Sequence, residues 1–316
     1  RLVFKMKYPE ILILEYAADR PGDLKYLLNI ARPKIGVITA VGDIPAHVEF
    51  YSGPESVIRE KARLVEQLSA LGFAVLNIDD KAVAGLKEYT RAHLMTFGFD
   101  RSADVRISNF EIQFDSKPFG ISFKIEYKGS FVPIRINGVL GRSQAYSIAA
   151  AASVGLIFGL NLVKIAEAFA DFKSLPGRMN LIDGIKGSYV IDDSYNASPL
   201  SMHAALETLK EIKATRKIAV LGDMLEIGKY SIEAHETIGD LAAGIADILI
   251  TVGPRAKFIA ESAKVAGLSE EKIFIFDKVE LAGKKLQDLI KKGDLMLIKA
   301  SRAMQLDKIV EELKAF

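Results

Sequence analysis

Short, uninterrupted apolar runs alternate with amphipathic segments through the first third of the chain. The apolar runs occupy residues 11–14, 35–39 and 73–77, and the segments between them include residues 21–31 and 54–71. A run without polar interruption is typical of a parallel strand buried on both faces, and apolar residues repeating every three to four positions indicate a helix. The pattern therefore predicts a parallel sheet covered by helices, with its first strand at residues 11–14.

The pattern changes between about residues 99 and 135. Polar and apolar residues alternate at 119–125, and Lys128-Gly129 is a turn signal, so we expect a small antiparallel insert on the parallel core. Helices should then run from about residue 143 to 172. The uncharged stretch 143–163 contains polar residues and a turn at 159–161, which favours two short buried helices over a membrane span.

A second alternation of strands and helices follows Pro176-Gly177, a pair that commonly interrupts structure. The expected strands are residues 189–192, 218–221, 248–252, 273–276 and 295–299. Each connection holds a helical segment, as right-handed parallel crossovers require. A length of 316 residues also suggests two domains. We therefore expect an α/β protein with two doubly wound domains, 1–175 with the antiparallel insert and 176–316 with a Rossmann-like sheet.

Composition narrows the possible functions only slightly. The chain has 42 Lys and Arg against 40 Asp and Glu, and a net charge of +2 gives no reason to expect nucleic acid or an anionic membrane as a partner. The absence of cysteine excludes disulfides and thiolate chemistry within the chain.

Polar residues gather after two apolar runs of the second half, at 192–199 and 222–226. The carboxyl ends of parallel strands meet where open α/β sheets bind ligands. Turn formation alone would account for Asp193 and Asn196, and helix capping is as good an explanation for Asp223 and Glu226 as an active-site role. The residues alone also favour ordinary surface or packing roles for Glu15, His47 and Lys61.

Motifs in one fixed order nevertheless run through nearly the whole chain: residues 15–23, 39–42, 47–49, 61, 77–80, 141–142, 176–179, 192–199, 221–228, 235 and 299–302. This order resembles the Mur ligases of peptidoglycan synthesis, and most closely the type that adds D-alanyl-D-alanine. The resemblance implies ATP-dependent amide formation, in which a UDP-MurNAc-peptide carboxylate forms an acyl phosphate that the amine of D-alanyl-D-alanine attacks. It also implies Mg²⁺ as a cofactor, a cytoplasmic location and a monomer without membrane insertion.

The resemblance carries specific roles to residues of this chain. The metal site would use Glu15, His47 and Lys61, the last carbamylated by CO₂. The other residues with an implied catalytic role are Asp193, Asn196 and Lys299. Nucleotide would be bound by Arg178, Ser147 and Asp193. The substrate-binding residues would be Asn196, Ser198, Asp223, Glu226, Ser301 and Arg302.

Three departures from the family pattern affect what the resemblance implies. Arg63 stands where the family commonly has an acidic residue, and Ser143, Gln144 and Ser147 replace its usual His, Asn and adenine-holding Asn. The phosphate-binding pattern G-x-x-x-x-G-K-[ST] also occurs nowhere in the sequence. The resemblance places Arg1 inside the central domain, beyond that loop and the UDP-sugar domain.

We therefore expect residues 1–316 alone to lack ligase activity. Two alternatives stay open at this point. One is a non-catalytic nucleotide- or peptide-binding module derived from the Mur ligase fold. The other is a different member of the superfamily, such as a folylpolyglutamate synthase or a Mur enzyme that adds another residue.

Overall fold

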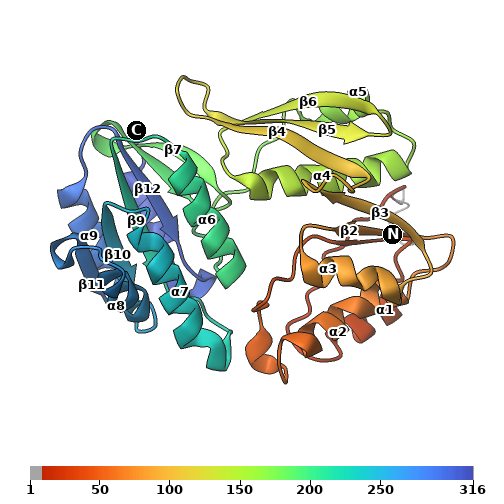
Figure 1. Ribbon diagram of the computed structural model, residues 1–316, viewed down its shortest axis with the longest axis horizontal. Helices are drawn as coiled ribbons and strands as arrows, with labels where there is room; N and C mark the ends of the chain where they lie inside the picture. The colour runs from red at the N-terminus through yellow and green to blue at the C-terminus, as the bar shows by residue number, and fades with distance from the viewer. Residues whose placement is uncertain (1–8, 316) are drawn as a thin grey trace, which may run out of the picture.

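Two six-stranded sheets form the framework of the protein (Figure 1). The computed structural model describes residues 9–315. The first sheet has the strand order β1-β2-β3-β4-β5-β6, in which β1 to β4 are parallel and β4 to β6 antiparallel. Its strands are β1 (Ile35–Ile38), β2 (Phe73–Asn77), β3 (His93–Gly98), β4 (Val105–Gln113), β5 (Gly120–Tyr127) and β6 (Ser130–Asn137).

Each face of this sheet is buried under its own helices. Ala74 and Leu76 of β2 join the core with α2, whereas Val75 between them joins the core with α4 and α5. This alternation explains why a central parallel strand reads as a continuous apolar run. The helices of this half are α1 (Asp23–Ile30), α2 (Pro54–Glu66), α3 (Lys81–Gly85), α4 (Arg142–Ile157) and α5 (Leu162–Phe169).

The predicted strand at residues 11–14 is wrong. These residues adopt no strand, and their side chains are 48–88% exposed. Within the described chain β1 pairs only with β2 and forms the edge of the sheet, so the segment has no strand beside it. An apolar run becomes a strand only where a neighbour satisfies its backbone hydrogen bonds.

The antiparallel insert is confirmed, as β4, β5 and β6, but it extends the parallel sheet instead of forming a separate layer. The sequence did not predict β3, because its first residues are largely exposed and lack a continuous apolar run. The uncharged stretch 143–163 forms nearly all of α4, the turn after it and the first two residues of α5. Among residues 9–315, no helix has the length and apolar character needed to cross a membrane.

The second sheet has the order β11-β10-β9-β12-β8-β7 and is parallel except for β7 at its edge. All five predicted strands are confirmed, whereas β7 was not predicted. The strands are β7 (Asn180–Gly184), β8 (Ser188–Asp192), β9 (Arg216–Gly222), β10 (Ile248–Val252), β11 (Ile273–Phe276) and β12 (Asp294–Lys299). Helices α6 (Pro199–Glu211), α7 (Ser231–Ala243) and α8 (Lys257–Val265) share one core, and α9 (Val279–Leu289) and α10 (Asp307–Leu313) share the other.

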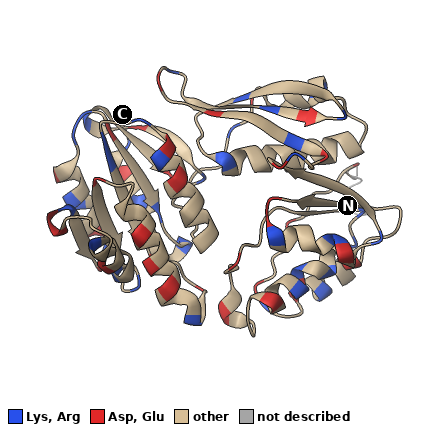
Figure 2. Cartoon of the chain, in the orientation of Figure 1, with Lys and Arg blue, Asp and Glu red and all other residues tan. Residues whose placement is uncertain are grey.

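The two halves touch at opposite ends of their interface (Figure 1). At one end, Phe114 and Phe119 from the β4–β5 loop pack on Tyr189 of β8, with ring centroids 5.4 and 5.3 Å from it. We call this the aromatic contact. At the other end, the 3₁₀ turns η1 (Val48–Phe50) and η4 (Gly228–Tyr230) meet, and we call this the loop contact. Acidic and basic residues are interspersed over both halves (Figure 2).

Candidate active site

A buried ion pair lies where strands β8 and β12 end. Lys299 closes β12, Asp193 follows β8, and the Lys299 Nζ lies 2.5 Å from Asp193 Oδ2. Lys299 also donates to the Asn196 carbonyl over 2.8 Å, and Asp193 Oδ1 accepts from the Met179 amide over 3.1 Å. The two side chains are only 2% and 11% exposed. Three of the four predicted catalytic residues, Asp193, Asn196 and Lys299, therefore come together, whereas Lys61 lies elsewhere. The ion pair holds the loop after β8 against the chain that joins the two halves.

An exposed tyrosine stands beside this pair. The guanidinium carbon of Arg178 lies 4.1 Å from the centre of the Tyr195 ring, and that of Arg302 lies 5.6 Å from it. Both arginines can interact favourably with the π face of the ring. Tyr195 thus gathers two cations from separate segments near the ends of β8 and β12. No role was expected for Tyr195 from the sequence, although it is the only aromatic residue within 192–199.

Two other residues of this loop mainly shape the backbone. Ser198 caps α6, because its hydroxyl accepts from the Ser201 amide while the Ser201 hydroxyl accepts from the Ser198 amide. The Asn196 side-chain oxygen accepts from the Ala197 amide over 2.9 Å. Substrate binding by either side chain stays a prediction.

Asp223 performs the capping role that the sequence left open. Its Oδ1 accepts from the amides of Arg255 and Ala256, over 2.9 and 2.7 Å, immediately before α8. The Ser301 hydroxyl accepts from the Leu225 amide over 2.9 Å and is 5% exposed at the residue level. Both side chains therefore stabilise the loops around β9 and β12, and ligand contact by them stays a prediction.

His235, on α7, stabilises the loop after β9 through contacts of both its ring nitrogens. Its Nε2 accepts from the Met224 amide over 3.0 Å, and its Nδ1 lies 2.6 Å from the Ser231 carbonyl, to which a proton on Nδ1 is donated. The ring is fully buried, and this burial lowers the pKa of His235. A neutral ring with its proton on Nδ1 satisfies both contacts.

A second polar cluster joins the two halves. His47 of the first half has its Nδ1 2.6 Å from Glu226 Oε2 of the second, and its Nε2 3.4 Å from Asp19 Oδ1. The short contact to Glu226 does not meet hydrogen-bond geometry, so the buried Nδ1 has no hydrogen-bond partner within the described chain. Lys61 belongs to the same neighbourhood: burial lowers its pKa, and the charge of Asp19 opposes this shift. Asp19 lies within the motif 15–23 but was given no role from the sequence.

The predicted metal ligands are only partly assembled. Glu15 is exposed and makes no hydrogen bond or ion pair with another residue of 9–315. In that same range, no three His, Cys, Asp or Glu side chains converge as a metal site. The assignment of Glu15, His47 and carbamylated Lys61 to Mg²⁺ stays a prediction.

The structure accounts for the basic residue at position 63. Arg63 Nε lies 2.9 Å from Glu60 Oε2, and Glu60 is only 4% exposed at the residue level. The other carboxylate oxygen of Glu60 accepts from the amides of Gly22 and Leu24 at the start of α1, each over 3.1 Å. Arg63 therefore compensates a buried carboxylate that anchors α1.

The departures in α4 also have local partners. Gln144 donates to the Arg178 carbonyl over 2.9 Å and so ties α4 to the connection between the halves. The Ser147 hydroxyl donates to the Ser143 carbonyl over 3.1 Å, while the residue itself is exposed. Its role toward adenine stays a prediction.

Two α/β halves with polar residues at the carboxyl ends of their strands form a class of proteins that bind ligands at those strand ends. The family model for the Mur ligase middle domain matches residues 1–155, and the model described as "Mur ligase, glutamate ligase domain" matches residues 177–302. The chain belongs to the Mur ligase family.

Individual relatives agree with this assignment. A UDP-N-acetylmuramoyl-tripeptide–D-alanyl-D-alanine ligase of Mycobacterium leprae is 32% identical over 96% of this chain and 63% of its own length. A ligase of the same name from Rickettsia prowazekii is 30% identical over 96% of this chain and 66% of its own length. A solved MurF ligase from Thermotoga maritima in complex with ADP shares 29% identity and a TM-score of 0.83, over 97% of this chain and 67% of that one. The chain thus spans less than two thirds of the length of these two curated relatives.

Proposed function

We propose that the full-length protein carrying this chain is an ATP-dependent ligase that joins D-alanyl-D-alanine to a UDP-MurNAc-peptide. The observation that carries this proposal is the contact of His47 with Glu226, which joins the two halves. The family resemblance assigns His47 to the metal and Glu226 to the substrate. The similarity to D-alanyl-D-alanine ligases over 96% of the chain supports the substrate class. We further propose a cytoplasmic monomer, as the resemblance implies.

The reaction has two steps. A carboxylate oxygen of the peptide attacks the γ-phosphorus of ATP, and the bond from that phosphorus to ADP breaks. The unprotonated amine of the dipeptide then bonds to the acyl carbon, the bond from carbon to the phosphate oxygen breaks, and the nitrogen loses a proton. The departing phosphate takes up this proton, so the products are an amide, ADP and inorganic phosphate. Phosphoryl transfer of this kind depends mainly on positioning and charge neutralisation.

Residues of this chain can supply both the positioning and the charge neutralisation. Arg178 offers a guanidinium suited to phosphate or ribose contacts, and Tyr195 holds it beside Asp193 and Lys299. Closure of the two halves would exclude water, which would otherwise hydrolyse the acyl phosphate. On this proposal the nucleotide would bind near the connection between the halves and the acyl group near His47.

The cluster around His47 suits a divalent cation in two respects. His47 Nδ1 is buried and lacks a hydrogen-bond partner among residues 9–315, and the Asp19 carboxylate lies beside the other ring nitrogen. A carbamate on Lys61 would add the oxygen ligands that Mg²⁺ prefers. When bound, the ion would neutralise charge on the transferred phosphoryl group.

Carbamylation of Lys61 requires a neutral amine, which burial of this residue favours. Full-length protein incubated with ¹³C-bicarbonate should show a carbamate carbon resonance that disappears in Lys61→Arg. Lys164→Arg, which changes an exposed lysine on α5, should leave it unchanged. A resonance that persists in Lys61→Arg would contradict the assignment.

The proposed function is tested with ATP, a UDP-MurNAc-tripeptide and a panel of amine donors. The full-length protein should ligate D-alanyl-D-alanine and release ADP and phosphate in equal amounts. Ligation of glutamate or meso-diaminopimelate instead would assign it to another branch of the superfamily. Nucleotide binding without turnover of any donor would favour the non-catalytic binding module.

A further inference from the structure

We propose that Tyr195 is a positioning residue, whose ring holds the guanidinium groups of Arg178 and Arg302 together as a two-arginine clamp for the phosphate groups of a nucleotide. This inference rests on the proposed function, because it takes a nucleotide as the ligand. It adds a role for Tyr195, to which the family resemblance gives none. It also reassigns Arg302, which the resemblance gives to the substrate.

The backbone around Arg178 is fixed, whereas its side chain has a single support. The Gly177 amide donates to Asp192 Oδ2 over 3.0 Å, and the Arg178 carbonyl accepts from the Gln144 side chain over 2.9 Å. The Arg178 guanidinium, by contrast, forms no ion pair within residues 9–315 and lies against the Tyr195 ring, with 4.1 Å from its central carbon to the ring centre. The ring therefore sets the direction of this side chain.

Arg302 reaches the same ring from the end of β12. The Ser301 amide donates to the Asp223 carbonyl over 3.0 Å, which fixes the backbone next to Arg302. The central guanidinium carbon of Arg302 lies 5.6 Å from the centre of the Tyr195 ring. Its ion pair with Asp307 spans 3.3 Å between side chains that are 62% and 43% exposed, and an exposed pair of this kind contributes little. Arg302 can therefore exchange this partner for a ligand.

The ring also explains how two like charges can share one place. Two guanidinium groups near each other repel, which favours conformations that separate them. The negative face of an aromatic ring attracts each cation. Tyr195 therefore offsets part of the repulsion before a ligand binds, and the ligand finds both arginines already in position.

Phosphate groups suit this clamp better than a carboxylate does. Asp193, two residues before Tyr195, is already paired with Lys299 over 2.5 Å, so it does not neutralise the arginines. Each guanidinium can form paired hydrogen bonds with phosphate oxygens. A chain of two or three phosphates offers such oxygens to both arginines at once, whereas one carboxylate pairs in this way with only one of them.

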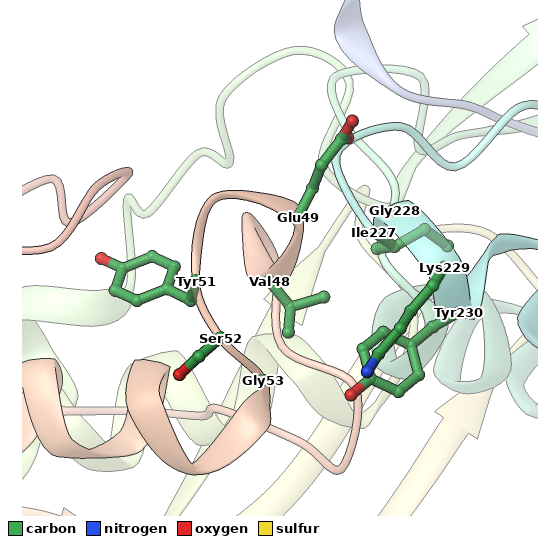
Figure 3. Close-up of a pocket in the computed structure, with 9 residues that line it drawn as sticks. All are labelled: Val48, Glu49, Tyr51, Ser52, Gly53, Ile227, Gly228, Lys229 and Tyr230. Atoms are coloured by element: carbon green, nitrogen blue, oxygen red, sulfur yellow. The ribbon is translucent and has the colours of Figure 1, made fainter.

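The pocket at the loop contact does not offer the same chemistry (Figure 3). Its lining residues lie within 48–53, in and after η1, and 227–230, in and before η4. Lys229 is the only cation of the lining, and Glu49 is a carboxylate of the same lining. A phosphate chain there would meet one positive and one negative charge, so the ring of Tyr195 marks the better phosphate site.

The direct test measures ADP binding by the full-length protein carrying Tyr195→Leu, Tyr195→Phe or Tyr89→Leu. Tyr89 is the matched control, because it is 42% exposed against 44% for Tyr195 and has the Arg59 guanidinium carbon 5.7 Å from its ring centre. Tyr195→Leu removes the ring and should raise Kd for ADP about fivefold or more. Tyr195→Phe keeps the ring and should stay within about twofold of the wild type, as should Tyr89→Leu.

Two further measurements separate positioning from a structural effect. Arg302→Met should raise Kd for ADP about tenfold, through loss of charged hydrogen bonds, and leave KM for D-alanyl-D-alanine within about twofold. In a protein that already carries Arg178→Met and Arg302→Met, adding Tyr195→Leu should no longer weaken ADP binding, because the ring acts through the arginines. Adenosine, which has no phosphate, should bind the wild type and Tyr195→Leu equally.

The opposite results would overturn the inference. Tyr195→Phe as weak as Tyr195→Leu would assign the effect to the hydroxyl group, and equal losses of adenosine and ADP binding would place the ring against the nucleobase. A raised KM for the dipeptide in Arg302→Met, with ADP binding unchanged, would return that residue to the substrate. A wild type that binds ADP but does not ligate would refute the proposed function alone, whereas one that binds no ADP would overturn both.

Discussion

Lys299 and Asp193 neutralise each other inside the protein, so neither can lose its partner without leaving a buried charge. Lys299→Met should lower the free energy of unfolding by about 3–5 kcal/mol, the usual effect of breaking a buried pair. Lys264→Met removes the exposed ion pair with Glu270 and should change the free energy of unfolding by no more than about 1 kcal/mol. Urea unfolding of both variants measures the difference. Equal losses of unfolding free energy in the two variants would show that the ion pair of Lys299 and Asp193 is not buried.

His235 predicts how stability depends on pH. Burial lowers its pKa in the folded protein, whereas the unfolded chain keeps the ordinary value of about 6.5. Below that value the unfolded state binds a proton that the folded state does not, so this residue makes stability fall as pH falls, by at most about 1.4 kcal/mol per pH unit. The decline should begin near pH 6.5 and end below the folded pKa.

The measurement is the free energy of unfolding between pH 5 and 7.5 for the wild type, His235→Gln and His203→Gln, the last altering an exposed histidine. The curve of His235→Gln should be flatter in this range, and that of His203→Gln should follow the wild type. Parallel curves for wild type and His235→Gln would contradict a neutral, buried ring.

At the scale of elements, the connection between the halves packs closely on the loop after β8. Gly177 has φ +74°, and a Cβ there would lie 2.9 Å from the Tyr195 amide nitrogen. Gly138 has a similar φ of +76° but open space around it. Both alanine variants carry the backbone strain, and only Gly177→Ala adds a clash.

Gly177→Ala should therefore unfold at a lower denaturant concentration than Gly138→Ala. Its free energy of unfolding should be lower by about a further 1–3 kcal/mol. The rate of ligation should also fall further in Gly177→Ala than in Gly138→Ala, because the displaced loop carries Asp193 and Tyr195. Equal stabilities would mean that the loop and the connection are not in contact in solution.

The elements also show what the sequence could predict. Strands such as β8, β9 and β10 were recognised because their side chains alternate between two cores and the whole run is apolar. Residues 11–14 have the same apolar composition but no strand beside them in the described chain, and β7 is an edge strand in which only Gly184 is buried. Strand pairing depends on distant parts of the chain, which a local pattern does not contain.

The candidate site divides in the same way. The ends of strands placed Asp193 and Lys299 in one neighbourhood, and the structure brings them into contact. The contact between His47 and Glu226 joins residues 179 positions apart and depends on how the halves dock. The capping bonds of Asp223 depend on the α8 loop, which sequence spacing does not locate.

At the scale of the whole molecule, the aromatic contact and the loop contact should respond differently to substrates. Lid and domain motions commonly enclose reactants. We expect the halves to move about the aromatic contact, so that nucleotide and peptide stabilise the contact between η1 and η4 that the structure shows. Residues 1–316 contain no cysteine, which makes introduced labels specific within this chain.

Spin labels at Ser52 and Ile232 should report a narrower distance distribution, centred on the closed arrangement of this structure, when ATP analogue and UDP-MurNAc-peptide are added. Labels at Lys117 and Lys186, beside the aromatic contact, should report no change. All four positions are exposed. A change in the Lys117–Lys186 distance with none in the Ser52–Ile232 distance would contradict this account, because the aromatic contact and not the loop contact would then move.

The most direct test of the ligase account follows the oxygen that the acyl phosphate would transfer. A UDP-MurNAc-peptide with ¹⁸O in its reacting carboxylate is incubated with ATP, D-alanyl-D-alanine and the full-length protein. The account predicts that one ¹⁸O atom from each ligated carboxylate appears in inorganic phosphate, in step with ADP and amide. Amide formation with unlabelled phosphate, or with release of AMP, would contradict it.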